Sequence, residues 1–380
     1  MPYKISEKRR AEYREMSKRS KERKAKALSG NGIKVIHKPN NPKFDPDSLL
    51  KPLRKNGLRC LSLFSGGGGF DLGFERAGFS HVACYELLEI CGQTLSKNLK
   101  EAKIYSGKNG DVRSVNWKSY KGKVDIIHGG PPCQPFSIAG DQRGHLDERD
   151  MWPFFIQAVL EIEPKCFIAE NVPGLLDAKF GQYVKEVIEK PLHNKYHLKK
   201  FILKAEDFGV PQTRSRIFFV GFKNKKDSER FEIPEPTHVK NGALNLYGAV
   251  VMGAREALGL RDIGFDCSAP TIRSGFTGPR NTTGVINSSA SFKVWEKLQI
   301  WPNGVQKTRD LSSRFPPENK HFRLSIQDCA LLQGFPEKWC FDGAVYQVLG
   351  QIGNSVCPPV SYNLAKSIAR VFISSDGRSR

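Results

Sequence analysis

The sequence predicts an α/β protein built on a parallel sheet, with a second, smaller and loop-rich domain. From residue 58 to residue 222, short apolar runs alternate with amphipathic stretches, which is typical of strands joined by crossover helices. Between residues 223 and 322 this alternation gives way to Gly, Ser, Thr, Asn and Pro. Residues 323–372 return to a helix-forming composition, so we expect the chain to come back to a regular fold there.

Each expected strand is a short apolar run, and each expected helix has apolar residues at helical spacing. Strands of this kind are covered by helices on both faces of a sheet. The expected strands are residues 58–64, 81–85, 124–128, 166–169 and 216–222. The expected helices are residues 70–77, 88–99, 152–162 and 183–190.

The chain is strongly basic, with 60 Lys and Arg against 39 Asp and Glu, a net charge of +21 and a pI near 9.6. Residues 1–57 hold 17 basic and 6 acidic residues, a net of +11. This surplus predicts a polyanionic partner, most often a nucleic acid. Residues 7–28 have the composition of a solvated helix, and a Pro- and Asn-rich linker follows. Such an arm can grip phosphates or merely keep the chain soluble, and both interpretations stay open.

Several protein classes are excluded by composition. No apolar run approaches the roughly 18 residues that span a bilayer, and the charged N-terminus does not resemble a secretory signal, so we expect a cytoplasmic location. The nine cysteines contain no C-x-x-C pair, which argues against zinc, and we expect no bound metal. Their scatter indicates buried, reduced thiols, one of which can be reactive.

The first chemical motif is a glycine-rich turn between an apolar strand and a helix, LSLFSGGGGF at residues 61–70. Glycines allow backbone amides to approach a ligand at a helix N-terminus. The spacing fits neither G-x-G-x-x-G nor a P-loop. Glu86 follows the second strand, where a carboxylate can bind both hydroxyls of a ribose, and Asp111 lies at a third strand edge. Either carboxylate alone can be a solvated loop residue, but together with the turn they favour a nucleoside cofactor.

The second motif, GGPPCQPFS at residues 129–137, follows the strand at 124–128. Two prolines stiffen the loop that presents Cys133. An α/β fold places its reactive groups at the carboxyl edge of its strands, so we expect a reactive thiol here rather than a small core side chain.

Two further motifs bring charge to the same edge. Glu170, in AENVPG at residues 169–174, also ends an apolar strand. Gln212, Arg214 and Arg216 alternate with period two in QTRSR and therefore share one face. Arginines on a strand are usually surface charges, but two in register beside an acid and a thiol indicate a clamp for an anion or a carbonyl.

In this order, the four motifs resemble those of the DNA (cytosine-5) methyltransferase family. The resemblance covers residues 59–222 and resumes at residues 323–336 and 351–356. It implies a Rossmann-like S-adenosylmethionine-dependent methyltransferase sheet with a smaller, loop-rich target-recognition domain. Residues 1–57 then form a basic extension and linker, 58–222 the catalytic and cofactor-binding domain, 223–322 the target-recognition domain and 323–380 a C-terminal segment that returns to the catalytic domain.

The resemblance also assigns roles to individual residues. Cys133 is implied as the nucleophile, Glu170 as the group that binds cytosine at N3 and its exocyclic amine, and Arg214 and Arg216 as residues that steady the base and the catalytic loop. S-adenosyl-L-methionine is placed against Phe64, Ser65, Gly66, Gly68, Gly69, Glu86, Leu87, Asp111, Val112, Pro132, Asn354 and Val356. Leu87 stands where relatives often have Trp, and Ser62 replaces a common acid.

These roles define a reaction. A Cys133 thiolate that adds to cytosine C6 makes C5 nucleophilic toward a methyl sulfonium, while Glu170 stabilises the charge that develops at N3. Nearby arginines can lower the pKa of the thiol. Because C6 is buried in a duplex, the base must flip out of the helix. No step requires a metal.

We expect residues 223–322 to recognise the target DNA sequence. Candidates for DNA contacts in this region are Thr271, Arg273, Arg280 and Asn281. Each of these can equally contact phosphate or solvent. Gln134, Ser137 and Arg149 are candidates in the loop that follows the thiol.

The expected partner is double-stranded DNA, and we expect a monomer. The enzyme can be the modification half of a bacterial restriction system, with a restriction endonuclease that acts separately, or an orphan methylase without one. Two alternatives remain: a tRNA-directed cytosine-5 methyltransferase, whose typical Cys-Phe-Thr tripeptide is absent from this sequence, and a catalytically idle DNA-binding regulator.

Overall fold

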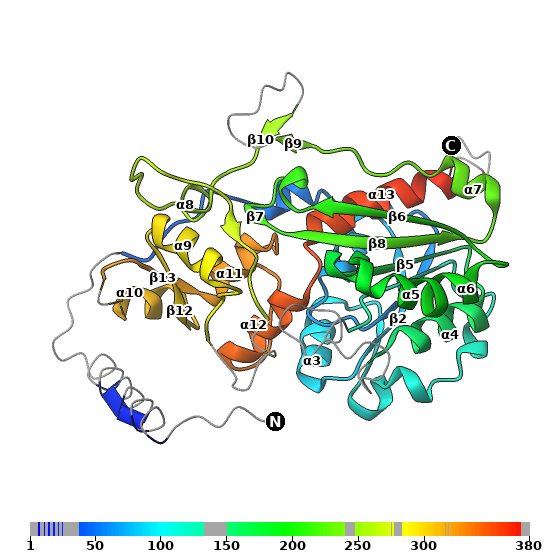
Figure 1. Cartoon of the computed structure of the whole chain (residues 1–380), viewed down its shortest axis with the longest axis horizontal. Coiled ribbons are helices and arrows are strands. Elements are labelled where there is room, and N and C mark those ends of the chain that lie inside the picture. Colours follow the sequence, from blue (N-terminus) through cyan, green and yellow to red (C-terminus); the bar gives the residue numbers. More distant parts are fainter. Residues whose placement is uncertain are drawn as a thin grey trace.

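A seven-stranded sheet forms the centre of the protein (Figure 1). The computed structural model describes residues 38–132, 150–239, 248–274, 276, 283–315, 317 and 319–373, and single residues between 7 and 25. The strand order is β3-β2-β1-β4-β5-β8-β6. Their bounds are β1 Arg59–Leu63, β2 Ser80–Glu86, β3 Lys103–Ser106, β4 Ile126–Gly129, β5 Cys166–Asn171, β6 His197–Lys204 and β8 Ser215–Phe222.

The prediction of a parallel sheet is correct for β1 to β5 and wrong for β8, which pairs antiparallel with both β5 and β6. Only ten residues separate the end of β6 from the start of β8, which is too short for a crossover helix, so the two strands form an antiparallel pair. The edge strands β3 and β6 were not predicted. No β3 residue is fully buried, and half of the residues of the lysine-rich β6 are exposed, so neither strand produces a long apolar run.

Helices cover both faces of the sheet, and the four predicted helices are confirmed within one or two residues. They are α2 Gly69–Arg76, α3 Glu89–Asn98, α4 Trp152–Ile162, and a continuous helical stretch made of α5 Gly181–Tyr183, a π-helix over Val184–Glu189 and α6 Lys190–Leu192. Side chains alternate between the two faces along β1: Cys60 belongs to the core under α2, and Leu61 to the core under α4. Short 3-10 helices fill the connections, at Gly107–Gly110, Val112–Ser114, Trp117–Tyr120, Pro173–Leu176, Ala178–Phe180 and Glu206–Phe208.

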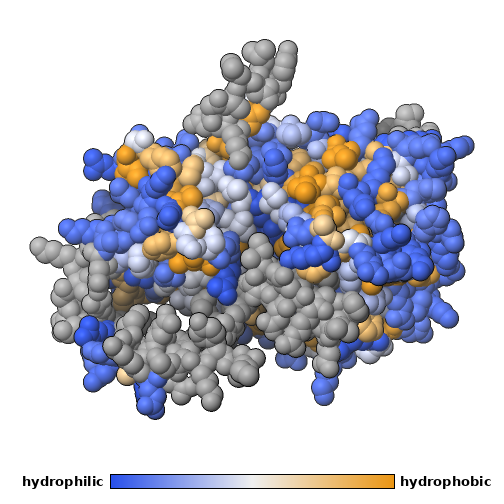
Figure 2. All heavy atoms as spheres, viewed as in Figure 1, coloured by the Kyte–Doolittle hydropathy of each residue, from blue (hydrophilic) through white to orange (hydrophobic). Residues whose placement is uncertain are grey.

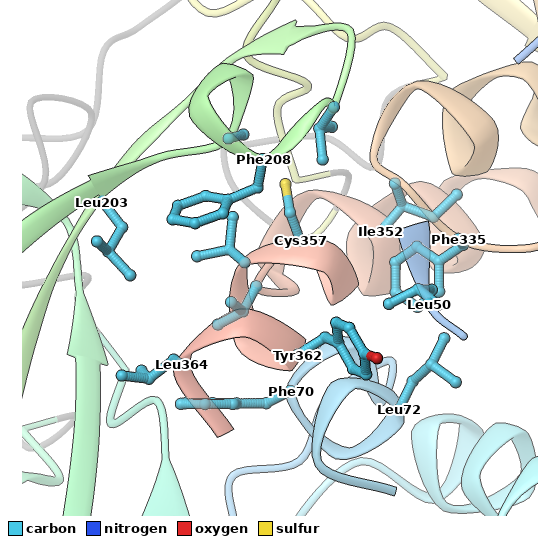
Figure 3. Close-up of a cluster of buried hydrophobic side chains, with 14 of the residues drawn as sticks. Leu50, Phe70, Leu72, Leu203, Phe208, Phe335, Ile352, Cys357, Tyr362 and Leu364 are labelled. Atoms are coloured by element: carbon cyan, nitrogen blue, oxygen red, sulfur yellow. The ribbon is translucent and has the colours of Figure 1, made fainter. Parts of the chain in front are cut away.

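The C-terminal segment completes the core of this sheet. It contains α11 Ile326–Leu332, α12 Val345–Asn354 and α13 Pro358–Ile373. Helix α13 packs against α2: Ser361 Oγ donates to the carbonyl of Gly69 at 3.0 Å. Figure 3 shows Phe70, Tyr362 and Leu364 in the resulting apolar cluster. The chain end therefore packs beside the glycine-rich turn.

A second lobe contains α8 Ala254–Ala257, α9 Ser289–Lys297, α10 Arg309–Arg314 and the paired strands β12 Ile300–Gln306 and β13 Phe322–Ser325. It joins the sheet lobe where β11 Ala269–Pro270 pairs with β7 Gln212–Thr213. The remaining short elements are α7 Lys225–Arg230 and the pair β9 His238–Val239 and β10 Ala249–Val250.

Residues 38–57, predicted as a linker, pack against both lobes. They include the 3-10 helix Pro46–Leu49, and the side chains of Phe44 and Leu50 are buried. The backbone N–H of Phe44 donates to Ala257 in the second lobe, and the N–H of Leu53 donates to Arg76 on α2. Proline-rich composition indicates the lack of a regular helix, but it carries no information about burial.

The face of the molecule in Figure 2 is mainly hydrophilic, with hydrophobic patches between the polar regions. Within the described part of the chain, no helix has the length and apolar character needed to cross a bilayer. The eight described cysteines are all free thiols, six of them buried. The helix expected over residues 7–28 is described at single positions only, where the backbone is helical and Arg19 pairs with Glu15.

Candidate active site

The strand register brings four motifs into one row at the carboxyl edge of the sheet. Leu63 at the end of β1 aligns with Tyr85 on β2 and with Gly129 on β4, and Gly129 aligns with Ala169 on β5. The residues that follow each of these positions are Phe64, Glu86, Gly130 and Glu170. Because β8 runs antiparallel to β5, its first residues, including Arg216, lie at the same edge.

Glu86 is fixed by the backbone of two turns. The N–H of Gly66 donates to Glu86 Oε2 at 2.7 Å, and the N–H of Leu88 donates to Oε1 at 2.8 Å. Burial raises the pKa of the Glu86 carboxyl, and these backbone donors oppose the rise. Phe64 enters the turn with φ of 56°, a left-handed conformation that is uncommon for a residue with a side chain and that often marks functional turns.

The four glycines of the turn have different surroundings. A Cβ at Gly66 would meet little besides the Phe64 carbonyl oxygen, at 4.0 Å, so this glycine borders open space. A Cβ at Gly68 would lie 2.6 Å from the Trp339 ring, and one at Gly69 would overlap the Val356 carbonyl oxygen. The prediction treated the run as a ligand-binding turn. Gly68 and Gly69 are required by packing of the turn against the C-terminal segment.

The predicted adenine side of the site is partly exposed. Leu87 is 55 % exposed, an unusual position for a large apolar side chain, whereas Val112 is buried. Asp111 caps the short helix Val112–Ser114 and pairs with Arg113, whose Nη2 lies 2.6 Å from Asp111 Oδ2. The neighbouring guanidinium lowers the pKa of the Asp111 carboxyl, which stays ionised.

The proline loop after β4 is held by a residue that the sequence motifs did not single out. Asn171, next to Glu170, donates from Nδ2 to the Pro131 carbonyl at 3.1 Å. A larger residue just before the prolines would crowd the acid, because a Cβ at Gly130 would lie 3.1 Å from Glu170 Oε2. Pro132 is the last described residue before Cys133. Cys133, Gln134, Ser137 and Arg149 lie outside the described residues.

Glu170 is buried and forms an ion pair with the partly buried Arg216, whose Nε lies 2.7 Å from Glu170 Oε1. Glu170 is only 7 % exposed. Burial raises the pKa of the Glu170 carboxyl, and the charges of Arg216 and Arg214 oppose the rise. The carboxyl is therefore more easily protonated than a free glutamate, although it lies beside a cation.

Arg214 contacts a different part of the chain. Its Nη2 donates to the carbonyls of Gly353 and Ser355, both at 2.9 Å, at the turn between α12 and α13. Gln212 is also buried and donates to the Leu332 carbonyl and to Gln333 Oε1. Of the three residues predicted to share a face, only Arg216 contacts Glu170. Arg214 and Gln212 instead hold the C-terminal segment against the sheet lobe.

That attachment sets the position of the last predicted cofactor residues. Val356 is buried and Asn354 is exposed at the turn before α13. Trp339 donates from its indole N–H to the Gly67 carbonyl at 3.1 Å. Trp339 and Asn171 were missed because their partners are far away in the sequence.

The predicted DNA-contacting residues are only partly described. The hydroxyl of Thr271 donates to the Thr213 carbonyl, and the N–H of Arg273 donates to the Val285 carbonyl. The Thr271 hydroxyl therefore helps join the second lobe to β7, the short strand directly before Arg214. Arg280 and Asn281 lie outside the described residues. Asp150, the first described residue after Pro132, accepts hydrogen bonds from the Tyr183 hydroxyl at 2.8 Å and from the Trp152 N–H at 3.1 Å.

Comparisons with known proteins agree on one family. The family model described as C-5 cytosine-specific DNA methylase matches residues 58–370. The Type II methyltransferase M.NgoMIV of Neisseria gonorrhoeae is 33% identical over 319 residues, covering 82% of this chain and 97% of that protein. M.FnuDI of Fusobacterium nucleatum is 32% identical and covers 82% of this chain and 94% of its own length.

Solved structures show the same fold. A putative DNA modification methyltransferase of an E. coli prophage has a TM-score of 0.55 and 26% identity, covering 83% of this chain and 99% of that one. The Spodoptera frugiperda DNMT2 mutant structure has a TM-score of 0.56 at 17% identity, covering 82% of this chain and 99% of that one. The second likeness supports the Rossmann-like methyltransferase fold alone.

Proposed function

The chain belongs to the C-5 cytosine-specific DNA methylase family, and from that premise we propose that it methylates C5 of a flipped cytosine in a specific duplex sequence through a covalent Cys133 adduct. DNA cytosine-5 methylation is the activity of this family, and the curated relatives are Type II methyltransferases. The adduct, the flipped base and the residue roles below belong to this proposal.

The observation that carries the proposal is the ion pair of the buried Glu170 with Arg216, beside the proline loop that leads to Cys133. A carboxyl whose pKa is raised by burial can hold a proton toward N3 of a cytosine. Arg216 keeps that carboxyl in place and stabilises negative charge when the proton is shared with the base. Arg214 acts at a distance, because it fixes the turn at Gly353 and Ser355.

The chemistry follows from these positions. The Cys133 thiolate forms a bond to C6, and the electrons of the C5–C6 double bond move through the ring toward N3, where Glu170 supplies a proton. C5 then forms its bond to the methyl group as the bond from that methyl group to the donor sulfur breaks, and the N3 proton returns to Glu170. Loss of the C5 proton to a base re-forms the C5–C6 double bond as the C6–S bond breaks. The thiolate is regenerated.

The cofactor edge has the groups that S-adenosylmethionine requires. Gly66 borders open space, Leu87 presents an exposed apolar surface, and the fixed Glu86 carboxylate can accept bonds from ribose hydroxyls. Phe64, Ser65, Gly68, Gly69, Asp111, Val112, Pro132, Asn354 and Val356 are proposed to complete the pocket. When bound, the cofactor supplies an electrophilic methyl group on a sulfonium.

The second lobe is proposed to select the DNA sequence, and the basic residues 1–57 to grip the phosphates. The lobe is attached through the β7–β11 pair to the segment directly before Arg214 and Arg216, so a protein that reads bases there can also align the target with Glu170. We further propose that the enzyme acts as a monomer, in a restriction-modification system with a separate endonuclease.

A direct test is covalent trapping on genomic duplex DNA into which 5-fluorocytosine has been incorporated, because fluorine at C5 blocks the release step. We expect an S-adenosylmethionine-dependent adduct from the wild type and from Cys340→Ala, which removes an exposed cysteine. Cys133→Ala should form none while still binding DNA. An adduct that persists in Cys133→Ala would disprove the assignment of the nucleophile. Bisulfite sequencing of DNA from expressing cells would identify the recognised site.

A further inference from the structure

Five buried side chains that take no part in the proposed reaction meet beneath the glycine-rich turn. Cys60 comes from β1, His81 and Cys84 from β2, His128 from β4 and Asp71 from α2. His81 is 8% exposed and the other four have no solvent exposure. The ring of His128 packs against Phe70 and Phe74 of α2, with centroids 4.8 and 4.4 Å away. The group therefore lies on the sheet face that α2 covers.

An irregularity in the sheet brings two of these residues onto that face. Residues three apart on a regular strand point to opposite faces, as His81 and Cys84 would. The β1–β2 register shifts by one residue, because Cys60 aligns with His81 while Leu61 aligns with Ala83. The extra residue in β2 is a bulge, and it allows His81 and Cys84 to face α2 together.

The donor atoms are close enough to share one ion. His81 Nε2 lies 3.1 Å from His128 Nε2 and 3.5 Å from Asp71 Oδ1. The ligand atoms of Cys60, His81 and His128 all lie within 4.8 Å of one another. Tetrahedral zinc with bonds of about 2.0–2.3 Å places its ligands roughly 3.3–3.8 Å apart. The separations among Cys60, His81 and His128 need only side-chain adjustments to reach that geometry. Asp71 is within range of His81 but is grouped with Cys84 rather than with Cys60 and His128, so its side chain would have to rotate to become the fourth ligand.

Some polar atoms of these buried side chains lack a hydrogen-bond partner among the described residues. Within the described part of the chain, Asp71 Oδ2 and His128 Nδ1 have no hydrogen-bond partner. Burying a carboxylate without a countercharge is costly. A divalent cation would supply that charge.

We propose that Cys60, His81 and His128, with Asp71 as the fourth donor, bind one structural Zn²⁺. Zinc prefers nitrogen and sulfur ligands in a closed tetrahedral site. Its charge balances one thiolate and one carboxylate beside two neutral imidazoles. On binding, the Zn–S bond replaces the S–H bond of Cys60 and the thiol proton leaves to solvent. The sequence argument against zinc considered only cysteines close together in the chain, whereas these ligands come from three strands and a helix.

Zinc in this position would join β1, β2 and β4 to α2 without touching a substrate. Strand β1, which carries Cys60, is tied to the turn above it, because Ser62 Oγ lies 2.8 Å from Ser65 Oγ. The expected role is therefore structural: the ion holds the helix that begins at the glycine-rich turn.

The test is a metal analysis of the full-length protein, purified without a metal-affinity tag from zinc-supplemented medium. We expect about one zinc per chain. Removing it with a chelator should lower the melting temperature, and Zn²⁺ should restore it. Co²⁺ added to the metal-free wild type should give the visible bands of a tetrahedral site and a near-ultraviolet thiolate charge-transfer band.

Cys60→Ser and His128→Gln should each lose the zinc and the cobalt spectrum. Cys166→Ser is the matched control, because Cys166 is an equally buried cysteine on β5 outside the cluster, and it should retain both. Zinc-free wild-type protein that gives no cobalt bands would overturn the proposal. Unchanged zinc content in folded Cys60→Ser and His128→Gln would also overturn it. The cobalt titration uses the wild type, so it does not depend on a variant that folds.

Discussion

Two buried glutamates at one edge of the sheet differ in the groups that offset the cost of burying their carboxylates. Glu86 ends β2 and Glu170 lies near the end of β5, and both are less than a tenth exposed. Glu86 accepts N–H bonds from the backbone of Gly66 and Leu88. Glu170 faces the guanidinium of Arg216, which comes from the antiparallel strand β8.

The two arrangements suit different tasks. Backbone donors are in place once the turns have formed, so they hold the Glu86 oxygens rigidly as acceptors. An arginine holds a carboxylate through charge, and its effect on the pKa opposes that of burial. The Glu86 arrangement is suited to binding and the Glu170 arrangement to proton transfer. Each prediction below tests that distinction.

The largest effect is expected from Glu170→Gln. Replacing a general acid in a buried site typically reduces the rate by about 10²–10⁴-fold. Single-turnover methylation should slow by that factor, while calorimetry should show nearly unchanged affinity for S-adenosylmethionine. A loss of cofactor affinity without a loss of rate would reverse the roles assigned to the two glutamates.

Glu86→Gln should give the opposite pattern. A hydrogen bond to a charged group contributes about 1.5–3 kcal/mol, so cofactor binding should weaken by roughly 10–100-fold. The rate at saturating S-adenosylmethionine should change little. Equilibrium titration with the cofactor, and kinetics at high cofactor concentration, separate the two effects. A slow enzyme with normal cofactor affinity would contradict the binding role.

The pH dependence of the methylation rate should come from the Glu170 carboxyl. Burial raises the pKa of its carboxyl, so the protonated form persists to higher pH than in a free glutamate. A rate that needs this proton is fully present below the pKa and falls as pH rises through it. Arg216 opposes the rise in pKa, so Arg216→Gln should move the alkaline limb of the pH–rate profile to higher pH. The limb should disappear in Glu170→Gln. A limb that moves to lower pH in Arg216→Gln would contradict the ion-pair argument.

The smallest effect is expected on protein stability, from a substitution at Trp339 beside the glycine-rich turn that binds Glu86. Trp339→Phe removes the hydrogen bond to the Gly67 carbonyl, which should cost about 1 kcal/mol in the free energy of unfolding. Trp295→Phe is the control, because its buried indole nitrogen has no hydrogen-bond partner among the described residues. Denaturant titration of both variants should show the additional loss only for Trp339. Equal losses would mean that ring packing, and not the hydrogen bond, matters at this position.

The features that are local in the chain were predictable from sequence. Helix α4 has the predicted bounds, Trp152–Ile162, because its apolar spacing is contained within the segment. The cofactor turn, the proline loop and the Glu170 strand end were recognised for the same reason. Their side-by-side position at one edge follows from parallel strands, and the register from β1 to β5 confirms it.

Features that depend on distant partners were not predictable. The direction of β8, the edge strands β3 and β6, and the packing of residues 38–57 follow from which segments lie side by side. Arg214 contacts Gly353, 139 residues away, and the donors of the proposed zinc site come from four separate elements. Periodicity records whether a side chain is buried, but it does not record which side chain lies against it. That information arises from strand register and helix packing.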